Sequence, residues 1–198
     1  MKKIIFAATI IVAFSVNLQA QVPSKEEMMK AWQVYMTPGD VHKMLSKSDG
    51  VWSEEVTMWM DPSGPPTKNK AEVTNRMIFG GRYQESKTSG TMDGKPFEGY
   101  GIVGYDNANK MFQSTWIDNM GTGTMFLEGT WDEPMKTIHF KGKCVDPSNG
   151  KEMMVREEYM IIDDNNQKME MFVTRGEQPE MKSLEIILKR KGKMPLKK

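Results

Sequence analysis

The sequence predicts a mainly β protein: a single antiparallel, up-and-down β-barrel of about ten strands, preceded by short helices. After Gly50 the chain alternates strand-like segments with short turns and shows no helical periodicity. A meander of that length in one domain usually closes on itself, because closure removes unpaired strand edges. With 198 residues, 38% of them hydrophobic, the chain is also long enough to bury one sizeable core. We therefore expect one barrel domain.

The first twenty residues have the layout of a secretory signal. Lys2 and Lys3 precede an uncharged apolar run, 4–16, and Ala20 supplies a small residue at the expected cleavage site. The run is shorter than the roughly 20 residues that a transmembrane helix needs. The sequence therefore predicts a signal peptide over 1–20 and an exported protein, periplasmic or extracellular, with no transmembrane segment.

The remaining composition excludes several classes of protein. The chain has two His and one Cys, Cys144, too few for a zinc ribbon or a disulfide scaffold. The net charge is +1, and the basic tail 191–198 contains no aromatic residue, so nucleic acid is not an expected partner. The fold must therefore be held by its core alone.

The mature N-terminus, 21–49, reads as helical. Ser24 and Glu27 have the spacing of a capping box, which satisfies free backbone donors at a helix start. Apolar residues recur at helical spacing after it: Met28, Trp32, Tyr35 and Met36. Pro38 precedes a second, shorter helical segment, which ends before Gly50.

The barrel domain is expected over 50–190. Its strands are predicted at 51–60, 71–79, 82–91, 96–105, 111–118, 124–131, 135–145, 151–162, 168–175 and 182–190. Between them stand turn-forming residues such as Asp93-Gly94 and Asp106-Asn107. The longest polar gap, 61–70, is rich in Pro and Gly and predicts a loop at the barrel rim.

Alternation along the strands predicts which side chains line the interior. The apolar candidates are Trp52, Met58, Trp116, Met125, Tyr159 and Met171, and the candidate polar anchors are Glu54, Arg76 and Arg156. Arg156 and Glu158 are two residues apart, so they point the same way, either inward as an ion pair or outward into water. A register error of one residue would reverse the face of any strand.

No catalytic motif emerges. Residues 99–104 match the dinucleotide pattern G-x-G-x-x-G, but a turn and a strand follow where that site needs a helix. These glycines are better explained by bending of the strand or by close cover from an aromatic neighbour within a sheet. The pairs Met58/Met60 and Met169/Met171 would suit Cu(I), but the methionines are scattered and serve equally as deformable packing residues. We expect no metal, no cofactor and no assigned catalytic residue.

Two resemblances support the barrel. Gly50-Val51-Trp52 resembles the G-x-W start of lipocalin-like (calycin) barrels, in which the Trp closes one end and an Arg packs over it; Arg190 is the matching residue. Segments from His42 to Arg190 resemble the bacterial domain-of-unknown-function family 1579: 80–82, 96–99, 104–107, 114–118, 120–123, 146–147, 150–151 and 156–157. That resemblance implies a calycin-like barrel and no particular activity.

Three hypotheses follow for function. The first is binding of a small, largely apolar molecule inside the barrel. The alternatives are an enzyme with a metal-independent site in the barrel, and a structural or interaction protein with a filled barrel. The interior volume and the polar atoms that face it discriminate between them. The ligand and the oligomeric state are not encoded in any motif.

Overall fold

The computed structural model describes residues 22–192, which form two helices followed by ten strands. The helices are α1 (Lys25–Met36) and α2 (Asp40–Ser46). The strands are β1 (Gly50–Met58), β2 (Thr67–Ile78), β3 (Tyr83–Met92), β4 (Lys95–Asp106), β5 (Met111–Asp118), β6 (Met125–Asp132), β7 (Thr137–Asp146), β8 (Lys151–Ile161), β9 (Asn166–Arg175) and β10 (Met181–Gly192). The expected signal peptide and most of the expected basic tail lie outside the described residues.

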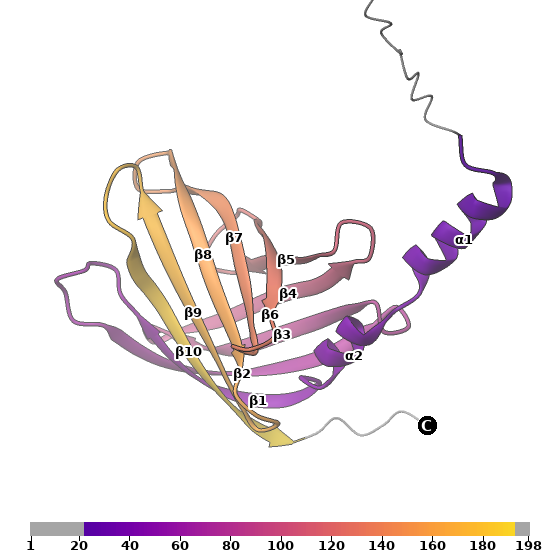
Figure 1. Ribbon diagram of the computed structural model, residues 1–198. Coiled ribbons are helices and arrows are strands. Elements are labelled where there is room, and N and C mark those ends of the chain that lie inside the picture. Colours follow the sequence, from indigo (N-terminus) through magenta and orange to yellow (C-terminus); the bar gives the residue numbers. More distant parts are fainter. Residues whose placement is uncertain (1–21, 193–198) are drawn as a thin grey trace, which may run out of the picture.

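The strands form a closed antiparallel barrel (Figure 1). Each strand pairs with its neighbours in sequence, and β1 pairs with β10 to complete the ring, with Glu54 opposite Leu188. The up-and-down barrel predicted from the turn spacing is confirmed. The turns that follow β1, β3, β5, β7 and β9 lie at one end of the barrel, and α2 lies at the other.

The β1–β2 loop is shorter than the sequence predicted. β2 begins at Thr67, and its first residues pair with β1, including Lys68 with Thr57 and Lys70 with Glu55. Polar residues are tolerated here because one face of a barrel strand meets water while both backbone edges are paired. The polar composition of 61–70 predicts a loop, but its last four residues, 67–70, belong to β2.

The two helices differ in how they meet the barrel. In α2, His42 and Leu45 are buried, and Gln84 Nε2 donates to the Leu45 carbonyl over 2.7 Å. In α1 the Ser24–Glu27 capping box is present, but no residue is buried, and the predicted apolar stripe is exposed, with Trp32 60% exposed. Arg82 reaches the carbonyl of Met36 at the end of α1 over 2.6 Å. Thus α2 closes the barrel, whereas α1 extends from it (Figure 1).

Trp52 and Arg190 complete the α2 end. Trp52 is fully buried, and its indole N–H donates to the Ser48 carbonyl over 2.9 Å. The Arg190 guanidinium lies 4.0 Å from the centre of the Trp52 ring and donates to the carbonyls of Lys47, Asp49 and Asp164. Gly50 opens β1 with φ 139°, a conformation that favours glycine. One cation therefore ties β10 to the α2–β1 connection.

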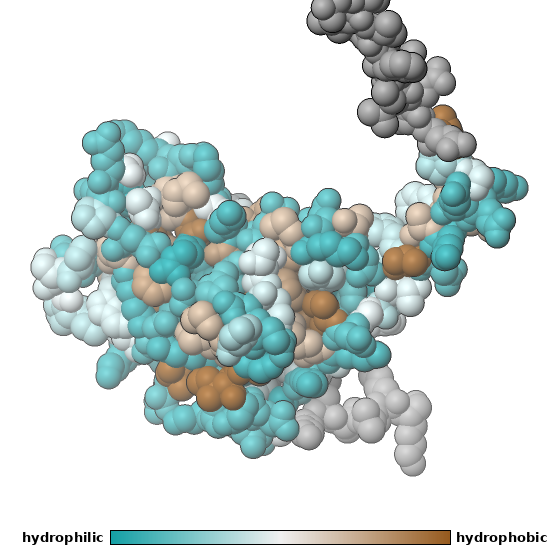
Figure 2. All heavy atoms as spheres, viewed as in Figure 1, coloured by the Kyte–Doolittle hydropathy of each residue, from teal (hydrophilic) through white to brown (hydrophobic). Residues whose placement is uncertain are grey.

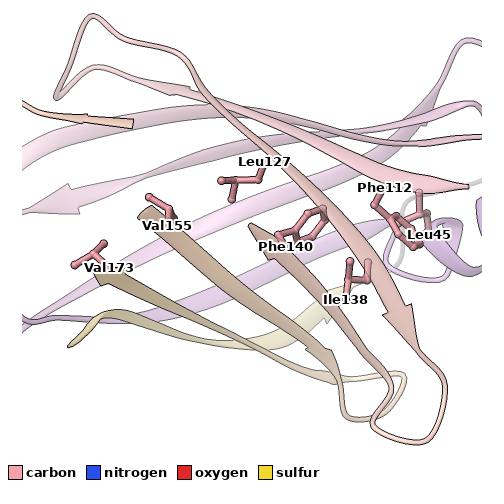
Figure 3. Close-up of a cluster of buried hydrophobic side chains, with 7 residues drawn as sticks. All are labelled: Leu45, Phe112, Leu127, Ile138, Phe140, Val155 and Val173. Carbon is pink, nitrogen blue, oxygen red and sulfur yellow. The ribbon is translucent and has the colours of Figure 1, made fainter. Parts of the chain in front are cut away.

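A cluster of buried apolar side chains fills part of the interior (Figure 3). It joins Leu45 of α2 to residues of β5–β9: Phe112, Leu127, Ile138, Phe140, Val155 and Val173. The face shown in Figure 2 is mostly hydrophilic, with smaller apolar patches on the barrel and on α1. Within residues 22–192 we find no helix of the length and apolarity required to cross a membrane.

Candidate functional site

The core cluster leaves a cavity of about 340 Å³ inside the barrel. Towards the β1–β2 end its lining is apolar apart from Asp118 at the end of β5. The apolar residues are Val56, Met58, Met92, Phe97, Trp116, Met120 and Leu184. Met120 lies in the β5–β6 turn and is 59% exposed, so the cavity reaches the surface at the end opposite α2. Strand alternation thus builds a cavity whose mouth is mainly apolar.

Polar side chains line the middle of the cavity and its α2 end: Glu54 of β1, Asn75 of β2, Gln84 and Ser86 of β3, and Glu157 and Tyr159 of β8. They alternate with outward residues, since positions two apart on a strand share a face. Glu54 is 7% exposed and Asn75 is 3% exposed. The polarity of the lining therefore increases along the cavity axis towards α2.

Some of these polar groups are satisfied by the protein. The Tyr159 hydroxyl donates to Gln167 Oε1, and Gln167 Nε2 donates to Ser48 Oγ over 2.8 Å. Gln84 Nε2 donates to Asp49 Oδ1 over 3.2 Å as well as to Leu45. This network connects the base of the cavity to the α2 end.

Glu54 and Glu157 differ from these hydrogen-bonded groups, because no hydrogen bond or ion pair within residues 22–192 compensates the charge of either carboxylate. Burial raises the pKa of Glu54 to about 7, and burial raises the pKa of Glu157 to about 7. The pKa of the Tyr159 phenol is also raised, first by burial and then by the charges of Glu54 and Glu157. All three groups therefore stay protonated to a higher pH than they would in water.

Trp116 is positioned over glycines of β4. A Cβ on Gly99 would lie 2.3 Å from the Trp116 ring, and one on Gly101 would lie 3.1 Å from it. The Trp116 indole N–H donates to Asp118 Oδ2 over 2.8 Å. Two glycines of the G-x-G-x-x-G segment, Gly99 and Gly101, thus make room for an aromatic side chain that lines the cavity.

Comparison with family models shows which family this barrel belongs to. The sequence profile described as "Protein of unknown function (DUF1579)" matches residues 37–190, which include α2 and nearly all of the barrel. The chain belongs to this family. No curated protein matches the sequence.

One solved structure supports the fold of this DUF1579 chain. Rv2717c from M. tuberculosis is 18% identical, and the similarity covers 79% of this chain and 100% of that one with a TM-score of 0.59. A redesigned β-barrel is 16% identical over 75% of this chain and 96% of that one, with a TM-score of 0.38. At this identity the first match bears on the fold alone.

The structure places six of the nine predicted site residues of this DUF1579 barrel in the cavity lining: Glu54, Met58, Trp116, Met125, Tyr159 and Met171. Trp52 is buried beneath the cavity, against Arg190, and does not line it. Met58 lines the cavity, whereas Met60 lies beyond β1 and is 80% exposed. Among residues 22–192, no three His, Cys, Asp or Glu side chains gather as a metal site.

The two arginines proposed as polar anchors do not reach the cavity. Arg76 lies on the opposite face of β2 from Asn75 and pairs with Glu85 over 2.8 Å. Arg156 stacks on Phe172, 4.0 Å from its ring centre, and forms ion pairs with Glu158 and Glu180. The outward alternative for the Arg156–Glu158 pair is therefore the observed one.

Sequence reasoning missed Glu157, Asn75 and Gln84. Glu157 lies on the opposite face of β8 from its neighbour Glu158, which pairs with Arg156 on the outer surface. Its period-two relation to Tyr159 was the signal that could have placed it inside. Asn75 and Gln84 carried no such signal, since polar residues in strands are ordinarily outward.

Proposed function

We propose that this barrel binds a small, largely apolar molecule in its interior. The observation that supports the proposal is the cavity of about 340 Å³, which is lined mainly by apolar side chains and reaches the surface opposite α2. Small-molecule sites are commonly concave, apolar and about 300–1,000 Å³ in volume. A filled barrel, the structural alternative, would leave no such space.

The volume limits the size of the occupant. If each non-hydrogen atom takes about 30 Å³, the share of one water in the liquid, the cavity accommodates about eleven such atoms. An unbranched chain of ten carbons with one polar terminal atom matches that number. Six methionines also line the cavity: Met58, Met92, Met120, Met125, Met169 and Met171. Because thioether chains adapt their shape, the site is suited to ligands of varied outline.

We further propose that binding takes place outside the cytoplasm. The charged start, short apolar run and small residue at 20 support export. N-terminal sequencing of protein isolated from the native cell envelope or culture medium tests this. A chain that retains residues 1–20 and fractionates with the cytoplasm contradicts it.

Decan-1-ol is a suitable neutral probe for binding, measured by calorimetry and by a thermal shift. Ser86 lines the cavity, and Ser86→Phe places a phenyl group in it. Lys87, the next residue, points outward with its side chain 61% exposed, so Lys87→Phe is the matched control. Binding lost in Ser86→Phe and retained in Lys87→Phe is expected. No heat and no shift with the unmodified protein contradict the proposal.

Acid–base catalysis in the same cavity is a second candidate. Glu54 and Glu157 have pKa values of about 7, the range suited to general acids and bases at neutral pH. Mass spectrometry of a pool of amphiphilic esters, amides and alcohols incubated with the protein tests it. Turnover must disappear in Glu54→Gln or Glu157→Gln; unchanged compounds throughout contradict catalysis and leave binding intact.

A further inference from the structure

The charged groups that line the cavity all have the same sign. They are Glu54, Asp118 and Glu157; in the part of the chain that the structure describes, no Lys, Arg or His lines it. The Arg190 guanidinium is engaged by backbone carbonyls beneath Trp52 and does not line the cavity. A ligand's polar end therefore meets carboxylates without any counter-cation.

Three of the polar acceptors are also left without partners. Asn75 Oδ1 is buried and has no hydrogen-bond partner among residues 22–192. The carboxyls of Glu54 and Glu157 are affected by burial alone, with no hydrogen bond or nearby cation to offset it. Asp118 differs, because it accepts from the Trp116 indole over 2.8 Å and from the Met120 backbone over 2.9 Å.

Buried polar groups of this kind ordinarily have partners, since an unpaired buried acceptor is costly. A group that satisfies several acceptors at once must carry several donors. An ammonium carries up to three N–H donors and a positive charge, whereas a hydroxyl carries one donor and a carboxylate carries none. The ligand group that best matches this lining therefore carries a positive charge.

We propose that the ligand is a cationic amphiphile: an alkyl or aryl amine whose ammonium group lies beside Glu54 and Glu157 and whose apolar body extends towards the cavity mouth, where Met58, Met92 and Met120 lie. This inference rests on the proposed function and specifies its ligand class. An anionic amphiphile of the same length is disfavoured, because it would bring a third negative charge next to two unpaired carboxylates.

The pH dependence of binding follows from the groups that face the site. These are Glu54 from β1, Glu157 and Tyr159 from β8 and Asp118 from β5, with Asp49 below them at the α2 end. Because the pKa of each glutamate is about 7, both are protonated at pH 5.5 and largely ionised at pH 8.5. Amine binding therefore tightens as pH rises, while decan-1-ol binding does not.

The test compares decylamine, decan-1-ol and decanoate by calorimetry at pH 8.5, where decylamine is still cationic. We expect decylamine to bind on the order of 10- to 100-fold more tightly than decan-1-ol, as for hydrogen bonds to charged groups. Decanoate should bind least well. Glu54→Gln and Glu157→Gln should each weaken decylamine binding about tenfold more than they weaken decan-1-ol binding.

Glu55→Gln is the matched control, because Glu55 follows Glu54 on β1 but points outward with its side chain 63% exposed. Circular dichroism of each variant verifies that its barrel is folded, and the pH series on the unmodified protein needs no variant. If decan-1-ol binds and decylamine binds no more tightly, the amine inference is wrong and the proposed function stands. If none of the three binds, both fail.

Discussion

Replacing Glu54 by Gln should make the barrel more stable at high pH. Unfolded, the Glu54 carboxyl ionises near pH 4.5; in the native barrel burial raises its pKa to about 7. The native state therefore holds its proton more tightly, and stability falls as pH rises from 4.5 through 7. Below pH 4.5 the carboxyl is protonated in both states, so the penalty vanishes there.

The magnitude follows from the shift. Moving from 4.5 to about 7 corresponds to about 3 kcal/mol of destabilisation once pH exceeds 8. For a chain of this size that is about 6–12 °C in Tm. Glutamine has nearly the same shape and no charge to ionise. Any fixed cost of its amide in the cavity is the same at all pH values and cancels in the comparison.

The assay is urea unfolding followed by circular dichroism at pH 4 and pH 8.5, without ligand. We compare the free energy of unfolding of Glu54→Gln with that of the unmodified protein at each pH. From pH 4 to pH 8.5, this difference should change by about 3 kcal/mol in favour of the variant. Glu55→Gln should shift by less than about 1 kcal/mol, since Glu55 is exposed and pairs only loosely with Lys189, at 3.7 Å.

A parallel pH profile for Glu54→Gln and the unmodified protein would refute the reasoning. It would mean that the carboxyl of Glu54 is as well solvated in the native barrel as in the unfolded chain. Water entering through the cavity mouth would then solvate the carboxylates. They would need no positive charge from a ligand, which removes the electrostatic reason to expect a cationic one. A shift of the opposite sign would point to a cation near Glu54.

Three further outcomes are expected. Arg190→Ala should lower the free energy of unfolding by about 2–3 kcal/mol in urea, because it removes charged donors from three carbonyls and the cover over Trp52. Arg156→Gln should change it by less than about 1 kcal/mol and leave decan-1-ol affinity unchanged, since Arg156 lies on the outer surface. Gly99→Ala should cost about 1–3 kcal/mol and shift the tryptophan fluorescence, because its Cβ displaces Trp116.

The fold was predictable because its signals are local. Turn residues recur at strand spacing, and ten such strands without intervening helices leave few arrangements other than a meander. The exposed stripe on α1 shows the limit of this reasoning. Periodicity placed Met28 and Trp32 on one face, but it cannot tell whether that face is covered, and in the structure it is not.

The site was predictable only where a strand's face was assigned correctly. On β8, Tyr159 was placed inside together with Arg156, although residues three apart on a strand point to opposite faces. The structure keeps Tyr159 and Glu157 inside and pairs Arg156 with Glu180 outside. Buried carboxyls are uncommon, so alternation alone gave little reason to place a glutamate in the interior.

The pairing of β1 with β10 has a consequence for how the chain reaches its native state. Residues such as Val56 and Ile186 are 130 positions apart, yet their backbones must join before the ring is complete. Contacts of such long sequence separation are slow to form. Until they form, β1 and β10 have unpaired backbone edges that other molecules can bind. A chain truncated anywhere before Met181 lacks β10 and cannot close the barrel.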